Sequence, residues 1–351
     1  MCEAISNTNF STNDHYLWRA TLLLGDDDVH DLLIYASHVL RDKSIMSNFF
    51  MACADLVEGY STPQNLTMIP IIPPLEELLP EPKGKKGNLT KKVNNHQEIL
   101  PWCYEICQPL EKHHNRLIFH VIVPEQVANL KRVCKEKKVT LSNALAVAFY
   151  TAANVVLGKA GGKNGETYRQ MEVPLSLTPY LSSQLPPEYQ GTLLNILTTT
   201  LKTKVQEYIH NSENFWKFVN AYQQEINDKI NNFIEYHSRN RTYKKSHLSR
   251  GVVAMKSFHE EQQQFCLGLA YSLNSQLLPN KSYSLFRPLY AFNFGSNGAG
   301  LYPIYLVNTP WQNQIHSTFV YSERLITTES VSEIIDMFDQ IILRHSHNIS
   351  L

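Results

Sequence analysis

Hydrophobic and polar positions change their period in the middle of the chain. Residues 117–123 form an apolar run rich in β-branched side chains, which predicts a buried strand. Pro124 follows directly and favours the first turn of a helix whose apolar residues keep to one face. Thr140 can cap a second helix over residues 141–157, and this helix is apolar nearly all round. We therefore expect the second helix to be buried and the two helices to pack together.

A third helix gives the strongest periodic signal in the chain. Its apolar residues are spaced by four, three, four, four and three positions, at Phe215, Val219, Tyr222, Ile226, Ile230 and Phe233. This spacing places them in one stripe along a helix, and core packing explains such a stripe better than a cofactor site does. A last helix, beginning at Thr327 or Thr328, repeats the pattern as far as Ile342.

The remaining apolar runs predict strands. One lies at residues 32–36, and the C-terminal third adds four more, at residues 265–273, 284–294, 301–307 and 316–321. Aromatic residues between 286 and 321 are interpreted as core. Strands mixed with helices without strict alternation indicate an α/β chain with a mixed sheet. Residues 61–101, which are rich in proline and lysine, interrupt both patterns and are interpreted as a linker.

Composition narrows the classes of partner. The 351 residues are 43% hydrophobic, enough for a sizeable core, and 32 basic residues balance 32 acidic ones. This balance argues against nucleic acid or an anionic membrane as partner. Six cysteines are too sparse for a disulfide scaffold and lack the paired spacing of a zinc site, so we expect no metal. Without an uninterrupted apolar run of about eighteen residues or a signal peptide, the chain is expected to be cytoplasmic and to have no membrane span.

The best candidate for chemistry follows the strand at residues 32–36. His38 is expected to lie at the end of this strand, and Asp42 follows four residues later. A neutral histidine titrates near working pH, so it can take a proton from a hydroxyl or an amine. Asp42 could accept the other ring N–H, or it could pair with an arginine and hold the loop. A structural alternative remains open, with His38 as a hydrogen-bonded buried histidine and Asp42 as the N-cap of a helix over residues 44–50.

Four segments, in order, resemble the chloramphenicol acetyltransferase-like superfamily. This superfamily includes the condensation domains of nonribosomal peptide synthetases, alcohol acetyltransferases and BAHD acyltransferases. Residues 35–44 are similar to its strand-borne HHxxxDG signature, and residues 139–145 are similar to the helix pair that follows its crossover, where a Thr-Leu start is common. The other two matches are to a strand with a Gly-Asn segment and to the DFGWG region, at Pro174–Thr178 with Gly191 and Asn195 and at Phe292–Gly295.

The resemblance implies two subdomains, each a mixed sheet covered by helices, with a tunnel at their interface. It implies acyl transfer from an acyl-CoA or a carrier-protein thioester to an alcohol or amine. His38 would be the general base, and Asp42 would support the site by pairing with an arginine. The thioester is a co-substrate and no other cofactor is expected. The implied partners are a small-molecule acyl acceptor and an acyl carrier protein.

Several positions depart from the superfamily pattern. Ser37 replaces the first histidine, Lys43 stands where glycine is usual, and Asn293 replaces the aspartate of the DFGWG-like segment. Only thirty-seven residues precede His38, so we expect an incomplete first subdomain over residues 1–100, which includes the HxxxD motif and the linker. Residues 101–351 are expected to form the second subdomain. The alternatives are a degenerate relative that only binds a carrier or ligand, and an unrelated α/β protein with a chance HxxxD.

Overall fold

The computed structural model describes sixteen segments of the chain, and the architecture below refers to them. They are residues 2–7, 18–25, 29–36, 55–56, 58–59, 97–98, 114–160, 170–176, 194–200, 205–239, 265–266, 269–273, 289, 291–293, 302–323 and 325–346.

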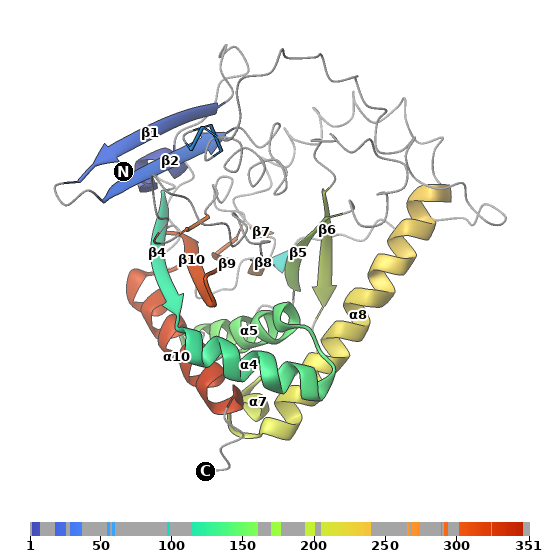
Figure 1. The fold of residues 1–351 in the computed structure, drawn as a ribbon. Coiled ribbons are helices and arrows are strands. Elements are labelled where there is room, and N and C mark those ends of the chain that lie inside the picture. The colour runs from blue at the N-terminus through green and yellow to red at the C-terminus, as the bar shows by residue number, and fades with distance from the viewer. Residues whose placement is uncertain are drawn as a thin grey trace.

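A six-stranded mixed sheet forms the centre of the described fold (Figure 1). Its strands lie in the order β4-β10-β9-β8-β5-β6, and all neighbours are antiparallel except β9/β8 and β8/β5, which are parallel. Both kinds of pairing in one sheet confirm the predicted mixed α/β class. The bounds are β4 Asn115–Ile122, β5 Gln170–Ser176, β6 Leu194–Thr200, β8 Leu269–Leu273, β9 Ile304–Trp311 and β10 Gln314–Ser322.

Two smaller sheets accompany it. β1 (Trp18–Leu24) pairs antiparallel with β2 (His30–Ala36), which confirms a strand over residues 32–36. β3 (Gln97–Glu98) pairs antiparallel with β7 (Phe265–Cys266), so a short strand lies inside the segment interpreted as a linker.

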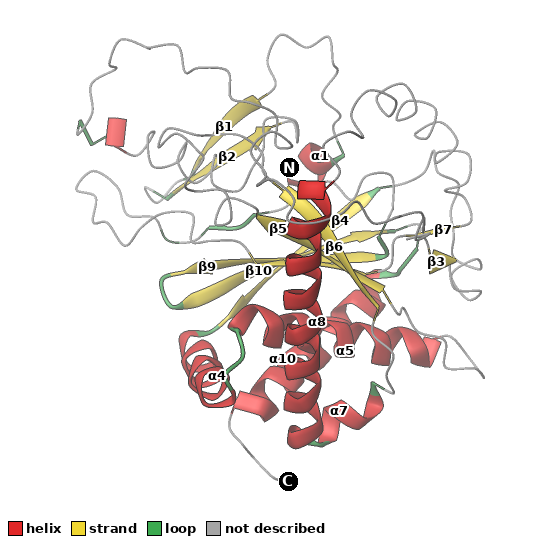
Figure 2. Cartoon of the chain, turned by 90° about the vertical axis from the view of Figure 1, so that its right-hand side faces the viewer, coloured by secondary structure: helices red, strands yellow, loops and turns green. Residues whose placement is uncertain are grey.

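The helices gather on one side of the six-stranded sheet (Figure 2). They are α4 (Pro124–Lys137), α5 (Leu141–Ala160), α7 (Gln206–His210), α8 (Ser212–Arg239) and α10 (Thr328–Ser346), while a short α1 (Cys2–Ser6) begins the chain. The four long helices confirm the four predicted from sequence. Thr140 is the predicted cap of α5, because its Oγ1 accepts the N–H of Asn143 at 3.2 Å.

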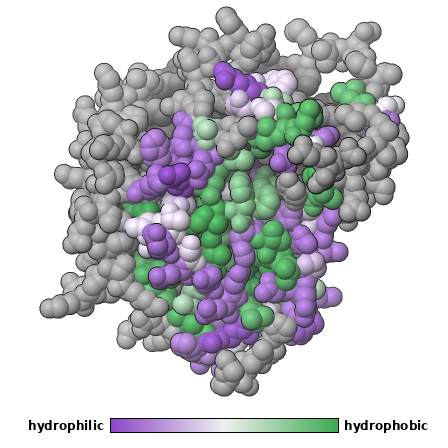
Figure 3. All heavy atoms as spheres, turned by 90° about the vertical axis from the view of Figure 1, so that its left-hand side faces the viewer, coloured by the Kyte–Doolittle hydropathy of each residue, from purple (hydrophilic) through white to green (hydrophobic). Residues whose placement is uncertain are grey.

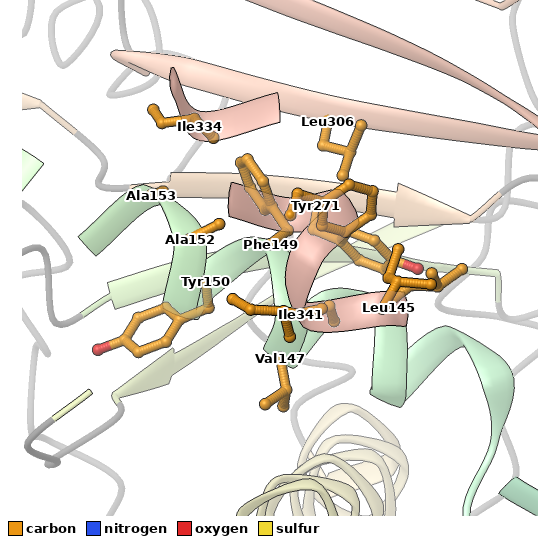
Figure 4. Packing of buried hydrophobic residues seen from close by; sticks show 14 of the residues in the cluster. Leu145, Val147, Phe149, Tyr150, Ala152, Ala153, Tyr271, Leu306, Ile334 and Ile341 are labelled. Atoms are coloured by element: carbon orange, nitrogen blue, oxygen red, sulfur yellow. The ribbon is translucent and has the colours of Figure 1, made fainter. Parts of the chain in front are cut away.

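The largest core lies between this helical layer and the sheet (Figure 4). Phe149 of α5 packs among Tyr271 and Leu306 of the sheet and Ile334 of α10. Within α5, the window Leu141–Gly158 is long and apolar enough to cross a membrane, and 78% of it is buried inside the protein. Its all-round apolar surface is therefore used in packing between the sheet and the neighbouring helices, as expected for a central core helix.

The predicted stripe on α8 also faces the core. Phe215, Val219, Tyr222 and Ile230 are buried, and Ile226 packs against the same cluster. α8 begins beside α7 and runs past β6 (Figure 1). The interpretation of the stripe as core rather than as a cofactor site is confirmed for these residues.

Two strand predictions need correction. The strand predicted over residues 284–294 is wrong for Leu289 and for residues 291–293, which belong to no strand. The backbone of Ala291 instead contacts the ring of His316, whose Nδ1 lies 3.1 Å from the N–H and the carbonyl oxygen of Ala291. The strand predicted to end at residue 307 continues to Trp311, because Gln312 and Asn313 form the hairpin turn with φ of 45° and 66°.

Candidate functional site

His38, Asp42 and the helix predicted over residues 44–50 lie outside the described residues. β2 ends at Ala36, two residues before His38, and β1 pairs with β2 along its whole length. The described part of the chain therefore supports the strand that leads to the predicted base, while the geometry of the His38–Asp42 pair stays a prediction.

The two faces of the six-stranded sheet differ in chemistry. Strand residues alternate between faces, and directly paired residues share a face. Residues such as Tyr271, Leu306 and Phe319 face the helices and belong to the large core. We call the opposite side the polar face and define it by Glu172, Ser272, Tyr305, Thr309, His316 and Thr318.

The register aligns the polar face in rows across the strands. Glu172 pairs with Ala270, and Ala270 pairs with Tyr305. Ser272 lies two residues beyond Ala270 in β8, and the Tyr305 hydroxyl donates to its Oγ at 2.9 Å. β5 pairs with β8 at only two positions, so this contact lies where the two strands stop pairing. An aromatic hydroxyl and a serine thus form a hydrogen-bonded group at the junction of β5, β8 and β9.

Glu172 is the carboxylate of the polar face. It lies on the inner strand β5 with only 6% of its surface exposed, and the Tyr302 hydroxyl donates to its Oε2 at 2.5 Å. Burial, together with the negative charge of Glu172, raises the pKa of Tyr302 above its usual range. Tyr302 therefore stays protonated and remains a hydrogen-bond donor to the carboxylate. A carboxylate held in this way can orient a polar group or accept a proton.

Two hydroxyls of the polar face lack partners among the described residues. Thr309 and Thr318 are fully buried, and neither Oγ1 makes a hydrogen bond to any residue that the structure describes. A buried hydroxyl without a partner costs stability, and the helical layer holds one as well, Thr151 Oγ1 of α5. What distinguishes Thr309 and Thr318 is their place on the polar face.

Leu289 and residues 291–293 lie against the other end of the polar face. The Trp311 Nε1–H donates to the carbonyl of Leu289 at 3.2 Å, and the ring of Phe292 stacks on His316 with centroids 4.8 Å apart. His316 Nδ1 lies 3.1 Å from both the N–H and the carbonyl oxygen of Ala291, and its Nε2 lies 3.0 Å from Gln314 Oε1. Burial lowers the pKa of His316, so its ring is neutral.

The sequence predicts one part of this arrangement and misses the rest. Phe292 and Asn293 belong to the segment that resembles the DFGWG region, and the structure places Phe292 against the polar face. Phe319 and Trp311 are core residues, as expected for aromatics between 286 and 321, whereas Tyr302 and Tyr305 are half-buried partners of polar groups. β10 has polar residues at Gln314, His316 and Thr318, but Ser317 between the last two is polar as well, so the sequence alone does not assign them to one face.

Metal and thiol chemistry find little support in the described part of the chain. Among these residues, no group of three or more His, Cys, Asp or Glu side chains is arranged to hold a metal ion. Cys134 is buried in α4, and burial raises the pKa of its thiol to about 12. Cys103 and Cys107 lie outside the described residues.

Comparisons with known proteins identify the fold. No protein-family model matches the chain, and no curated protein matches it. Solved structures do. The trichothecene 15-O-acetyltransferase from Fusarium sporotrichioides matches with a TM-score of 0.60 at 11% identity, over 94% of this chain and 70% of that one. The epimerization domain from the third module of tyrocidine synthetase B matches with a TM-score of 0.56 at 10% identity, over 95% and 73%.

A third solved structure extends the comparison. The EpoB cyclization-docking bidomain from Sorangium cellulosum, part of a nonribosomal peptide synthetase, matches with a TM-score of 0.56 at 11% identity, over 99% of this chain. The chain spans 65% of the length of that bidomain. At these identities the likeness concerns the fold. The chain has the chloramphenicol acetyltransferase-like fold that condensation-type domains and an O-acetyltransferase share.

Proposed function

We propose that the protein transfers an acyl group from a thioester to an alcohol or amine, with His38 as general base. The observation that carries this proposal is the fold, which an acetyltransferase shares over 94% of this chain and an epimerization domain over 95%. Two of the similar structures are parts of peptide synthetases, which supports an acyl carrier protein as the donor of the thioester; an acyl-CoA is the alternative donor.

The proposed step balances with one base and no further cofactor. His38 takes the proton from the hydroxyl or amine of the acceptor, and the acceptor atom forms a bond to the thioester carbonyl carbon. The carbon–sulfur bond then breaks, and the thiolate recovers a proton from the histidine. Asp42 would support the site by keeping His38 in position. Hydroxyls of the polar face, such as Tyr305 and Thr318, would bind polar groups of the substrates.

An acyl-transfer assay tests this function. The purified chain is incubated with a mixture of acyl-CoA thioesters and small alcohols and amines, and products are followed by mass spectrometry. We expect His38→Ala to lose about 10²–10⁴-fold in rate, the range of a general base. The matched control is His114→Ala, because His114 is an exposed histidine immediately before β4.

Two results would overturn the proposal. An unchanged rate in His38→Ala would remove the histidine from the reaction. No transfer by the folded wild type with any donor would contradict acyl transfer itself and favour a chain that only binds a carrier or ligand.

A further inference from the structure

The outer edge of β4 is covered by side chains from the start of the chain. β4 is the last strand of the six-stranded sheet on its side. The N–H of Asn115 donates to Asn7 Oδ1 at 2.7 Å, and Asn7 Nδ2 donates back to the carbonyl of Asn115 at 3.0 Å. Asn7 thus uses its carboxamide as a neighbouring strand would use its backbone. The N–H of Leu117 donates to Glu3 Oε1 at 3.2 Å.

These contacts show which backbone N–H groups of β4 point outward, away from β10. The N–H groups of Asn115 and Leu117 point away from β10, so strand alternation points those of Phe119 and Val121 the same way. Phe119 is 43% exposed and Val123 is 47% exposed. Figure 3 looks onto this side of the molecule and shows hydrophobic residues gathered between hydrophilic ones. The edge beyond Leu117 therefore combines strand geometry with exposed apolar side chains.

We propose that Glu3 and Asn7 form an edge guard, and that its release opens β4 to antiparallel pairing with β4 of a second copy of this chain. The guard already imitates a strand, which identifies a strand as the partner that fits this edge. Unprotected strand edges commonly pair with other chains, and proteins block them with such devices. The guard is held by surface contacts: Arg116 bridges Glu3 and Glu323, and all three side chains are at least one-third exposed.

A second copy fits the charges as well as the hydrogen bonds. Two β4 strands related by a two-fold axis run antiparallel and offer the same row of amides and carbonyls to each other. In a pair centred on His120, Phe119 of one copy lies opposite Val121 of the other, which buries exposed apolar surface. Arg116 then lies near Glu125 at the start of α4 of the other copy. When Arg116 loses Glu3, Glu125 offers a replacement carboxylate.

Oligomeric state tests the guard. The full chain is examined by size-exclusion chromatography with light scattering, as wild type and as the double variant Glu3→Ala/Asn7→Ala. We expect the wild type near its monomer mass of 40.3 kDa and the double variant at about twice that mass. The matched control is Glu323→Gln, which removes the other ion pair of Arg116 but leaves the guard bonds and should stay monomeric.

A second substitution tests the pairing itself. Val121→Pro removes an N–H that points outward and leaves the bonds to β10 in place, so it should return the double variant to a monomer. A monomeric double variant would overturn the proposal, and so would a dimer that Val121→Pro leaves intact. Should the double variant unfold, Glu3→Leu/Asn7→Leu, which keeps side chains of similar size but removes the guard bonds, carries the test. A dimer would support the guard, and a folded monomer would overturn it.

Discussion

The two faces of the six-stranded sheet are both buried, yet they are built from different residues. The helix-facing side is filled by large apolar side chains such as Phe149 and Phe319, which meet with ring centroids 6.3 Å apart (Figure 4). The polar face instead carries Glu172, Ser272 and Thr318 at positions of equal burial. Burial of polar groups costs free energy that close apolar packing does not. The large apolar side chains of the helix-facing side therefore contribute more packing to the stability of the fold than the polar side chains of the other face do.

Truncating one phenylalanine on each face should give the largest contrast. Phe319 is fully buried among Phe149 and Phe338, so Phe319→Ala should lower the free energy of unfolding by about 3–5 kcal/mol. Phe119 lies on the polar face of the neighbouring strand and is 43% exposed, so Phe119→Ala should cost only about 1–2 kcal/mol.

Urea unfolding followed by circular dichroism measures both variants. Equal losses would mean that the two faces contribute alike to stability, against the division drawn above. An unchanged denaturant slope in both variants would show that the losses concern the folded state.

Sequence patterns predict the helix-facing half of this comparison well. The helices α4, α8 and α10 each follow a period of about 3.6 residues, because one stripe of each is buried. α5 is instead apolar nearly all round, because it is buried between the sheet and its neighbours. Such patterns are visible in the sequence of each helix alone, whichever element the helix packs against. The prediction over residues 284–294 failed because the backbone of Ala291 bonds to the side chain of His316, which no local pattern reveals.

The polar face could not be predicted, because it depends on strand register. Glu172 and Tyr302 are 130 positions apart, and they meet only because β8 lies between β5 and β9. An isolated glutamate beside methionine and valine in a strand carries no signal of that partner. His38 and Asp42 were found through resemblance and remain predictions, whereas the hydroxyls that could line a substrate site emerge only from the fold.

A buried histidine in the helical layer makes stability depend on pH. His345 of α10 is fully buried: its Nδ1 accepts the hydroxyl of Ser212 and its Nε2–H donates to the carbonyl of Tyr208, both at 3.0 Å. Burial lowers its pKa from 6.5 to about 4, and the adjacent charge of Arg344 adds to this lowering. The unfolded chain therefore binds a proton first as pH falls. The free energy of unfolding should drop by about 3 kcal/mol between pH 6.5 and 4.

Unfolding midpoints at pH 7, 6, 5 and 4 check this expectation. His345→Asn should flatten the dependence, since the asparagine cannot take up a proton. His316→Asn on the polar face should remove a smaller part, because that histidine has a lowered pKa but lies outside the helical core. Exposed His114 provides the control, and His114→Asn should leave the profile unchanged. A steep profile that persists in His345→Asn would assign the acid sensitivity elsewhere.

Removing one unpartnered hydroxyl from each side of the sheet should change the free energy of unfolding least. It also compares the two sides most directly. Thr151 of α5 and Thr318 of β10 are both fully buried, and neither Oγ1 has a partner among the described residues. Valine keeps the shape and removes the unsatisfied group, so each Thr→Val change should raise the free energy of unfolding by about 0.5–1 kcal/mol. Their effects on stability should therefore match.

Their effects on acyl transfer should differ, and this step depends on the proposed function. Thr318 lies on the polar face, so Thr318→Val should raise KM for a polar acceptor more than for an apolar alcohol, while Thr151→Val changes neither. Steady-state kinetics with a matched pair of acceptors, one with an extra hydroxyl, measures this selectivity. The assignment of substrate binding to the polar face would fail if both variants kept the wild-type preference. It would also fail if Thr151→Val changed the preference as much as Thr318→Val, because the helix-facing side would then share in recognition.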